Sequence, residues 1–184
     1  MKKILGKLVL FLTGWKSTYP QEYHADKCVM LAAPHTSNWD LLFAMAVYWK
    51  EGINNKFFIK DMYTKGFFGF LFKWLGAIGV DRNKKNNLVE YAVELFKSNE
   101  ELVLMVPAEG TRKRVEKWRT GFYHIATKAE VPVALGFLDY KKKLAGVGKL
   151  IKLTGNFDED MTKIASFYKD ITGKYPELYN EKIF

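Results

Sequence analysis

The sequence predicts a single α/β domain whose mainly parallel or mixed sheet is flanked by helices. Apolar runs of strand length alternate along the chain with segments in which apolar residues recur at helical spacing. Several runs are continuously apolar, which is typical of strands buried on both faces of a sheet. The 184 residues hold no linker, repeat or low-complexity stretch, so they suit one domain with a sizeable core.

The chain begins with a predicted basic helix at residues 1–16. Lys2, Lys3 and Lys7 are interspersed with apolar residues, and Trp15 lies near the end. The apolar stretch is short and no small-residue cleavage site follows it, which argues against a signal peptide. Such a helix can lie in the interface of an anionic membrane. It fits equally well as a first helix docked on the core.

The elements that follow are placed by the period of their apolar residues. Residues 28–33 predict a buried strand, residues 41–49 an apolar helix and residues 56–60 a short strand. The sheet therefore begins with a strand, a helical crossover and a second strand.

An aromatic helix is predicted next, with Thr64 as its cap and Trp74 near its end. Its apolar stripe is so wide that little polar surface remains, and we expect the segment to lie in the core. Gly66 and Gly69 interrupt the stripe because they carry no side chain. Contact of this segment with an acyl chain or with lipid is therefore an alternative.

The second half of the chain continues the alternation. Residues 141–143 are three lysines that predict a solvated turn between two strands. His124 lies off the apolar face of its helix, so we interpret it as a surface residue. The predicted strands are 75–80, 102–106, 131–138 and 148–153, and the predicted helices are 87–97, one capped by Thr120 and one capped by Asp158.

The composition favours an anionic partner. The formal net charge is +9, from 29 basic and 20 acidic residues, which suits nucleic acid, an anionic membrane or a phosphorylated substrate. Aromatic residues make up 16% of the chain, as suits a protein that handles apolar ligands or bilayers. No apolar run approaches the roughly 20 residues needed to cross a bilayer.

The sulfur and imidazole side chains give little support for a metal site. Cys28 is the single cysteine, which excludes an intramolecular disulfide and a thiolate cluster and favours a reducing compartment. The histidines His24, His35 and His124 lack the spacing of a metal-binding motif. We expect neither a metal nor a cofactor.

The candidate catalytic stretch begins where an apolar strand stops abruptly at His35, with Asp40 five residues later. Open α/β sheets bind ligands at such strand-to-helix turns. A histidine there can act as a general base near neutral pH, and a carboxylate in reach can orient the ring and stabilise the imidazolium. Ser37 and Asp40 also fit a helix capping box, in which His35 is merely a turn residue.

Two more polar segments follow apolar strands, namely Arg82 and residues 109–112. In a wound α/β domain such strand exits converge on one edge of the sheet. A base, its carboxylate and two guanidinium groups around one pocket suit attack by a substrate that carries both a hydroxyl and a phosphate.

Four segments together resemble the glycerolphosphate acyltransferase superfamily, which includes the lysophosphatidic acid acyltransferases. Residues 35–40 match its H-x-S-x-x-D block, and residues 75–82 resemble an apolar strand that ends in a substrate-binding arginine. Residues 109–112 match the acidic-Gly-Thr-Arg core of the third block, and residues 131–133 resemble the fourth. The blocks stand in the family's order, which favours catalysis by His35 over the capping box alone.

The resemblance implies transfer of a fatty acyl group from acyl-CoA or acyl-carrier protein to a lysophospholipid-type acceptor in phospholipid biosynthesis, and we expect 1-acylglycerol-3-phosphate. It implies that His35 takes the proton of the acceptor hydroxyl, that Asp40 orients the ring, and that no acyl-enzyme forms. Backbone N–H groups at the helix start would stabilise the oxyanion. The implied substrate-binding residues are Arg82, Glu109, Gly110, Thr111, Arg112 and Arg119.

The basic, apolar residues 1–16 and the resemblance together lead us to expect a division of the chain and a location. Residues 1–16 would be an N-terminal amphipathic membrane-associating helix, and residues 17–184 the acyltransferase domain. The protein would be cytoplasmic and peripheral on the inner face of the cell membrane. Its expected partners are anionic lipid, the acyl-CoA or acyl-carrier protein donor and the lysolipid acceptor.

Departures from the family pattern keep other functions open. Pro34 stands where Asn is common, Ala108 separates Pro107 from the acidic residue, and Lys113 replaces a usual Ser. A different lysolipid, such as an amino-acid lipid, is one alternative acceptor. With water as acceptor the same site would be a thioesterase or lipid-hydrolase-like enzyme, although the chain has no G-x-S-x-G elbow. A non-enzymatic membrane or nucleic-acid binder is a third class, but no nucleic-acid motif accompanies the charge.

Overall fold

One mixed sheet forms the centre of the protein in the computed structural model, which describes residues 1–81 and 88–184. The strand order within these residues is β1-β7-β6-β2-β5-β3-β4. The run from β6 to β4 is parallel, whereas β7 is antiparallel to β6 and parallel to β1. The strands are β1 (Lys16–Thr18), β2 (Lys27–Ala33), β3 (Asn55–Lys60), β4 (Ala77–Val80), β5 (Leu102–Pro107), β6 (Val133–Asp139) and β7 (Leu144–Ile151). The α/β class with a mixed sheet is therefore confirmed.

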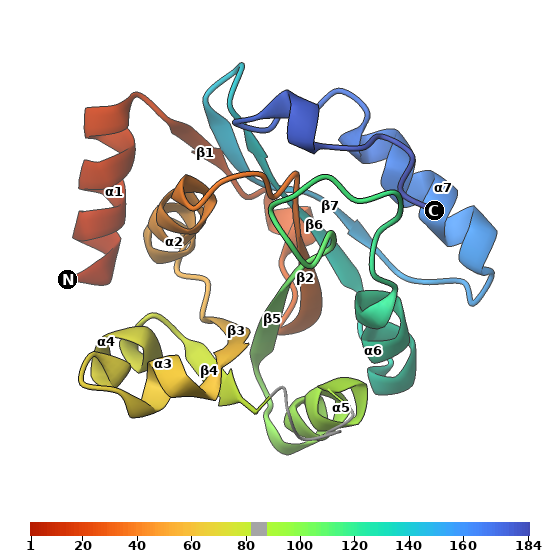
Figure 1. Ribbon diagram of the computed structural model, residues 1–184, viewed down its shortest axis with the longest axis horizontal. Helices are drawn as coiled ribbons and strands as arrows, with labels where there is room; N and C mark the ends of the chain where they lie inside the picture. The colour runs from red at the N-terminus through yellow and green to blue at the C-terminus, as the bar shows by residue number, and fades with distance from the viewer. Residues whose placement is uncertain (82–87) are drawn as a thin grey trace.

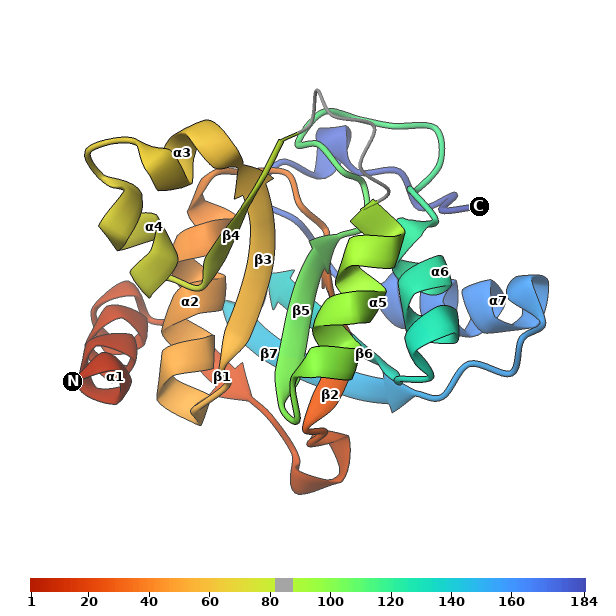
Figure 2. The ribbon, with the colours of Figure 1, turned by 90° about the horizontal axis from the view of Figure 1, so that it is seen from below.

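Helices cover both faces of the sheet (Figure 1). One face carries α5, α6 and α7, and the other carries α2, against whose outer side α1 packs (Figure 2). The helices are α1 (Lys2–Thr13), α2 (Trp39–Glu51), α3 (Asp61–Lys65), α4 (Gly69–Trp74), α5 (Leu88–Ser98), α6 (Gly121–Ala129) and α7 (Phe157–Tyr168), with short 3-10 helices at Gln21–Tyr23 and Pro176–Leu178.

The central strand β2 shows why the strand sequences are continuously apolar. Val29 and Leu31 pack into the core on the side of α5, α6 and α7, whereas Cys28 and Met30 pack into the core on the side of α2. All four side chains are buried. Since successive side chains of a strand point to opposite faces, a strand covered on both sides has no polar position.

The parallel strands bring their carboxyl ends to the same edge of the sheet. Ala32 near the end of β2 is paired with Pro107 of β5, and Ala33 is paired with Phe137 of β6. The residues that directly follow β2, β5 and β6 are therefore neighbours in space, although they lie far apart in the sequence.

Helix α1 docks on α2 through a side made of small and apolar residues. Gly6 and Leu10 are buried, and a Cβ atom at Gly6 would lie 2.4 Å from the carbonyl oxygen of Ala46. The opposite side of α1 exposes apolar side chains that include Leu8 and Phe11. Docking on the core is thus confirmed, while an apolar face remains open. Within the residues described, no helix is long and apolar enough to span a membrane.

The aromatic segment after β3 differs from its prediction. It folds as two short helices, α3 and α4, because Gly69 packs so closely on Thr64 that a Cβ atom would lie 2.2 Å from the Thr64 carbonyl oxygen. The expectation that this segment lies in the core was wrong. Phe72 contacts the core, but Phe67 and Phe70 are exposed, since a pair of short helices can bury only one side.

Two predicted helix caps are also corrected. Thr64 lies inside α3, and its hydroxyl donates to the carbonyl of Asp61 at 2.9 Å. The final helix is capped by Asn156, which accepts from the N–H of Glu159 at 3.3 Å, and Asp158 lies in the first turn. Both corrections shift a helix start by a few residues without changing the order of elements.

Candidate active site

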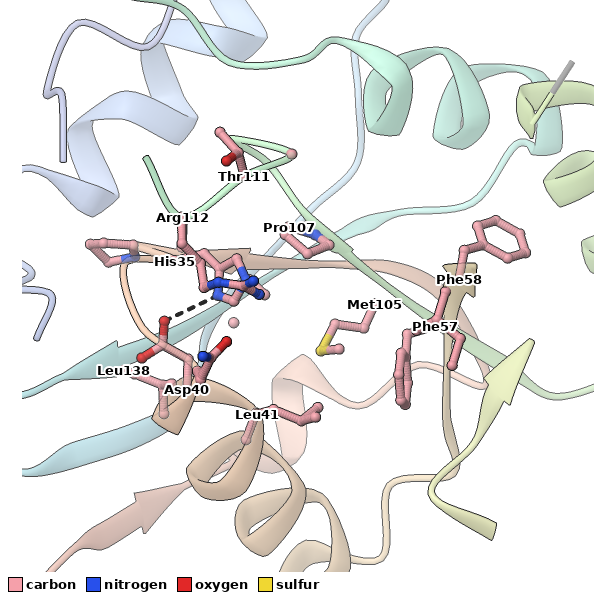
Figure 3. A pocket seen from close by; sticks show the side chains of 18 of the residues that line it. His35, Asp40, Leu41, Phe57, Phe58, Met105, Pro107, Thr111, Arg112 and Leu138 are labelled. Carbon is pink, nitrogen blue, oxygen red and sulfur yellow. Dashed lines mark hydrogen bonds and ion pairs between the residues drawn. The ribbon is translucent and has the colours of Figure 1, made fainter. Parts of the chain in front are cut away.

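His35 and Asp40 form the centre of the site. The chain leaves β2, turns through Pro34 to His35 and enters α2, whose first turn holds Asp40. The Nδ1 atom of His35 lies 3.0 Å from Oδ2 of Asp40 (Figure 3). Because a carboxylate accepts and does not donate, Nδ1 carries the hydrogen, and the lone pair of the ring is on Nε2. No described residue bonds Nε2, so it is available to a substrate.

The carboxylate of Asp40 serves the helix and the histidine together. Its Oδ2 also accepts from the backbone N–H groups of Thr36 at 3.0 Å and Ser37 at 2.9 Å. The hydroxyl of Ser37 in turn accepts from the N–H of Trp39 at 3.2 Å. This reciprocal pattern resembles the predicted capping box, but the N-cap of α2 is Asn38 and not Ser37. The capping and catalytic interpretations therefore describe one arrangement, in which the cap fixes the carboxylate that holds the ring.

Tyr140, which the sequence analysis missed, completes the surroundings of Asp40. Its hydroxyl donates to Oδ1 of Asp40 at 2.6 Å. Burial and the neighbouring carboxylate raise the pKa of Tyr140, so the hydroxyl remains a donor. Trp15 packs edge-on against its ring at 4.9 Å between centroids. Tyr140 directly follows β6, so the rule that singled out the polar exits of other strands could have found it.

Glu109 holds the backbone at His35 in place. Its Oε1 accepts from the N–H of His35 at 2.8 Å, and its side chain is buried. Burial raises the pKa of Glu109, and the hydrogen bond from His35 opposes that rise. In the part of the chain that the structure describes, Oε2 has no hydrogen-bond partner. The sequence motif predicted contact with substrate for Glu109, and the structure adds this contact with the histidine.

Three predicted substrate-binding residues, Gly110, Thr111 and Arg112, line one cavity with His35. Gly110 has φ 68°, a left-handed conformation that favours glycine. It turns the chain after β5 so that Arg112 lies beside His35 (Figure 3). Arg119, which was also predicted, is exposed and does not line this cavity, but its side chain lies against Gly110. Arg82 lies outside the residues that the structure describes.

The cavity has a volume of about 750 Å³ and two chemically different parts. The wall carries the cations Arg112, Lys113 and Lys60, and Figure 3 shows Arg112 beside His35. Figure 3 shows Leu41, Met105 and Phe57 further along the wall, away from the histidine. The apolar part is completed by Ala44, Tyr48, Phe58, Ile59, Tyr63 and Phe72. This combination suits a ligand with an anionic head and an apolar tail.

Lys60 and Lys113 are cavity residues that the sequence analysis did not assign. Lys60 ends β3 and Lys113 follows the motif at 109–112, so both are placed by the same carboxyl edge as His35. Their position after apolar strands was visible in the sequence, but lysines at strand ends are common on ordinary surfaces.

Fold and site together define an α/β protein with a histidine–carboxylate base at the carboxyl edge of parallel strands. The family model described as Acyltransferase matches residues 16–134, and the chain belongs to this family. The protein is therefore an acyltransferase, and the family resemblance seen in its motifs is confirmed.

A solved structure is similar to this fold. The 1-acyl-sn-glycerophosphate (LPA) acyltransferase PlsC from Thermotoga maritima aligns with a TM-score of 0.60, covering 91% of this chain and 75% of that chain. The two sequences are 15% identical, so the likeness shows the fold. None of the curated proteins matches the chain significantly.

Proposed function

We propose that the protein transfers a fatty acyl group from an acyl thioester to the hydroxyl of a lysophospholipid-type acceptor, 1-acylglycerol-3-phosphate. The observation that carries this proposal is the His35–Asp40 pair in a cavity whose wall holds Arg112 beside the histidine and apolar side chains further along. A base, an anion-binding wall and an apolar wall are the three parts that acylation of such an acceptor needs.

The reaction proceeds in this proposal by direct transfer. Nε2 of His35 takes the proton of the acceptor hydroxyl as its oxygen attacks the thioester carbonyl carbon. Asp40 holds the ring through Nδ1 and stabilises the imidazolium. The carbon–sulfur bond then breaks, and the imidazolium returns the proton to the leaving thiolate. No acyl-enzyme forms, and the reaction requires neither a metal nor a cofactor.

The phosphate of the acceptor would be bound by the cations of the cavity wall. Arg112, Lys113 and Lys60 line the cavity, and guanidinium groups bind phosphate through paired hydrogen bonds. Arg82 would join them and Arg119 would contribute charge from outside the cavity. Oε2 of Glu109, which lacks a partner among the described side chains, would accept a hydrogen bond from an acceptor hydroxyl. Gly110 and Thr111 would let the backbone approach the ligand.

Two of the backbone N–H groups at the helix start are not free to stabilise the oxyanion. The N–H groups of Thr36 and Ser37 are already bonded to Asp40. Asn38 lines the cavity next to them, and its N–H and amide groups have no partner within the described part of the chain. We therefore assign oxyanion stabilisation to Asn38 in this mechanism.

The proposed setting is the inner face of the cell membrane, with the protein cytoplasmic and peripheral and acting in phospholipid biosynthesis. The +9 charge suits anionic lipid and also an acidic acyl-carrier protein or acyl-CoA as donor. In this proposal residues 1–16 form the membrane-associating helix and residues 17–184 the acyltransferase domain.

Incubation of the purified chain with labelled acyl-CoA or acyl-carrier protein and a panel of lysolipids tests the function directly. We expect acylated 1-acylglycerol-3-phosphate as the main product. His35→Ala should lower kcat about a hundredfold or more, because general base catalysis contributes roughly that amount. Release of free fatty acid at an equal rate with and without acceptor would instead show a hydrolase.

His124→Ala is the matched control, since His124 is an exposed histidine of α6. It should leave kcat and the melting temperature unchanged. Full activity of a folded His35→Ala variant would refute the mechanism, and a product made only from an amino-acid lysolipid would replace the acceptor.

A further inference from the structure

The α3–α4 hairpin, residues 61–74, exposes a cluster of aromatic rings. We call Phe67, Phe68 and Phe70 the aromatic tip, and their exposed fractions are 90%, 62% and 70%. Phe67 and Phe68 contact each other edge-on at 5.2 Å between ring centroids. Single exposed apolar residues are ordinary, but several neighbouring aromatic rings mark an interaction surface.

The hairpin contacts the N-terminal turn of α1 through Trp74. The Nζ atom of Lys2 donates to the carbonyl of Trp74 at 2.8 Å and lies 4.7 Å from the centre of its ring. Figure 1 and Figure 2 both show α1 and α4 at the same end of the molecule. The exposed apolar side chains of α1 are Met1, Ile4, Leu5, Leu8, Phe11 and Leu12.

The charges around these apolar residues have one dominant sign. Residues 1–16 contain Lys2, Lys3, Lys7 and Lys16 and no acidic residue. Residues 61–75 contain Lys65 and Lys73 and the single acidic residue Asp61, which pairs with Lys65 at 2.6 Å. Apolar and aromatic side chains bordered by lysines are typical of elements that lie in the interface of an anionic bilayer.

The inner side of the same hairpin forms part of the cavity wall. Tyr63 of α3 and Phe72 of α4 line the cavity, and their ring centroids lie 5.7 Å apart. The hairpin therefore has one side on the apolar part of the cavity and the other side exposed. A bilayer that covered the exposed side would lie a single layer of side chains away from the cavity.

We propose that the α3–α4 hairpin inserts its aromatic tip into an anionic bilayer beside α1 and that acyl chains pass between bilayer and cavity along Tyr63 and Phe72. The membrane contact stands on the exposed residues alone, whereas the passage of acyl chains rests on the proposed function. Such a route avoids exposing the acyl chain to water, which is unfavourable for each of its methylene groups.

Vesicle binding of the full chain tests the membrane contact without any activity. The probes are phosphatidylcholine vesicles with and without phosphatidylglycerol. Phe67→Ser should weaken binding to the phosphatidylglycerol vesicles at least about tenfold, because an inserted Phe loses its burial in the apolar layer. The double variant with Phe70→Ser should bind more weakly still. Both sites are exposed, so the melting temperature should not change.

Phe184→Ser is the matched control, because Phe184 is a partly exposed phenylalanine at the opposite end of the molecule from α1 and α4 (Figure 1). Equal binding by the wild type and both tip variants, or an equal loss with Phe184→Ser, would overturn the proposal. So would a tip that mediates self-association or binding of acyl-carrier protein while vesicle binding stays intact.

Activity measured in two formats separates this inference from the proposed function. With detergent-dispersed substrates the tip variants should retain the wild-type rate, and with vesicle-embedded lysolipid they should be slower by about the loss in binding. Equal rates in both formats would reject the route for acyl chains while the function stands. Absence of transfer by the wild type in either format, together with tip-dependent vesicle binding, would reject the function and leave the membrane contact.

Discussion

The hydroxyl of Tyr140 holds the oxygen of Asp40 that His35 does not use. Oδ2 of Asp40 accepts three N–H groups, including Nδ1 of His35, while Oδ1 accepts the Tyr140 hydroxyl at 2.6 Å. The ring of Tyr140 is itself fixed by Trp15 and Phe43. Tyr140 therefore acts through Asp40 on the orientation of the catalytic imidazole and is a positioning residue.

Replacing Tyr140 by Phe should lower kcat about tenfold, since a hydrogen bond to a charged group of this kind is lost. The KM values for both substrates should stay unchanged, because Tyr140 does not belong to the cavity wall in the described part of the chain. Steady-state kinetics measures both quantities. A raised KM with an intact kcat would contradict the positioning role.

Tyr123→Phe is the matched control for that substitution. Tyr123 donates to Oδ2 of the buried Asp160 at 3.0 Å, a second tyrosine–aspartate pair that lies away from the cavity. Its loss should reduce stability and leave kcat unchanged. A similar fall in kcat for both variants would mean that the effect is structural.

Glu109 predicts a pH dependence of stability whose sign follows from burial. Its pKa in the folded protein is raised above the ordinary value of about 4.3. Below the ordinary value the carboxyl group is protonated in both states. As the pH rises from there to the folded pKa, the unfolded chain loses its proton first, so the folded state becomes progressively less stable.

Comparison of the wild type with Glu109→Gln isolates this effect. The free energy of unfolding of the wild type, minus that of the variant, should decrease as the pH increases through that window. Urea unfolding at a series of pH values measures the difference. A difference that is constant or increases with pH would show that burial does not raise the pKa of Glu109.

At the scale of elements, α1 has two sides with different tasks. Gly6 and Leu10 face α2 and allow close packing, while Ile4 and Leu8 are exposed. Trp15, just after the helix, packs on Phe43 of α2 at 4.4 Å between ring centroids. Deletion of residues 1–16 would remove core contacts as well as the exposed face, so substitutions distinguish the two roles better.

Substitutions on the exposed side of α1 should change vesicle binding, whereas a substitution on the buried side should change stability. Ile4→Ser with Leu8→Ser should weaken binding to anionic vesicles and leave the melting temperature unchanged. Gly6→Leu should lower the free energy of unfolding by about 1–3 kcal/mol, because its side chain would overlap the backbone of Ala46 and Lys50. Vesicle sedimentation and thermal unfolding measure the two effects. A lower melting temperature for the surface pair would mean that its side chains contribute to the core.

The α3–α4 hairpin shows where periodicity alone misleads at this scale. Its aromatic residues recur at helical spacing and predict a core helix, yet Gly69 permits a contact with Thr64 that divides the segment in two. Hydrophobic spacing reports which residues share a side of a helix. It does not report whether another element is available to cover that side.

At the scale of the whole molecule, strand order decides which distant segments meet. Neighbouring parallel strands β2, β5 and β6 bring His35, Glu109 and Tyr140 together, although 105 positions separate the first from the last (140 minus 35). The two exits that the sequence singled out at 35–40 and 109–112 both reach this edge. The third, at Arg82, lies outside the residues that the structure describes.

The amino-acid order was sufficient for most of the elements, for the fold class and for the family. Continuous apolar runs, helical spacing and the motifs at 35–40 and 109–112 are local patterns, and local patterns can be recognised in one dimension. These local patterns directly predict the buried strand β2 and the turn after it that holds His35 and Asp40.

Contacts between distant residues were decided by the tertiary structure alone. The bond from Tyr140 to Asp40, the bond from His35 to Glu109 and the exposure of the aromatic tip each depend on strand order or on a missing neighbour. No local pattern encodes these, because an orienting hydrogen bond needs two groups within about 3 Å and only the packed sheet brings such groups together.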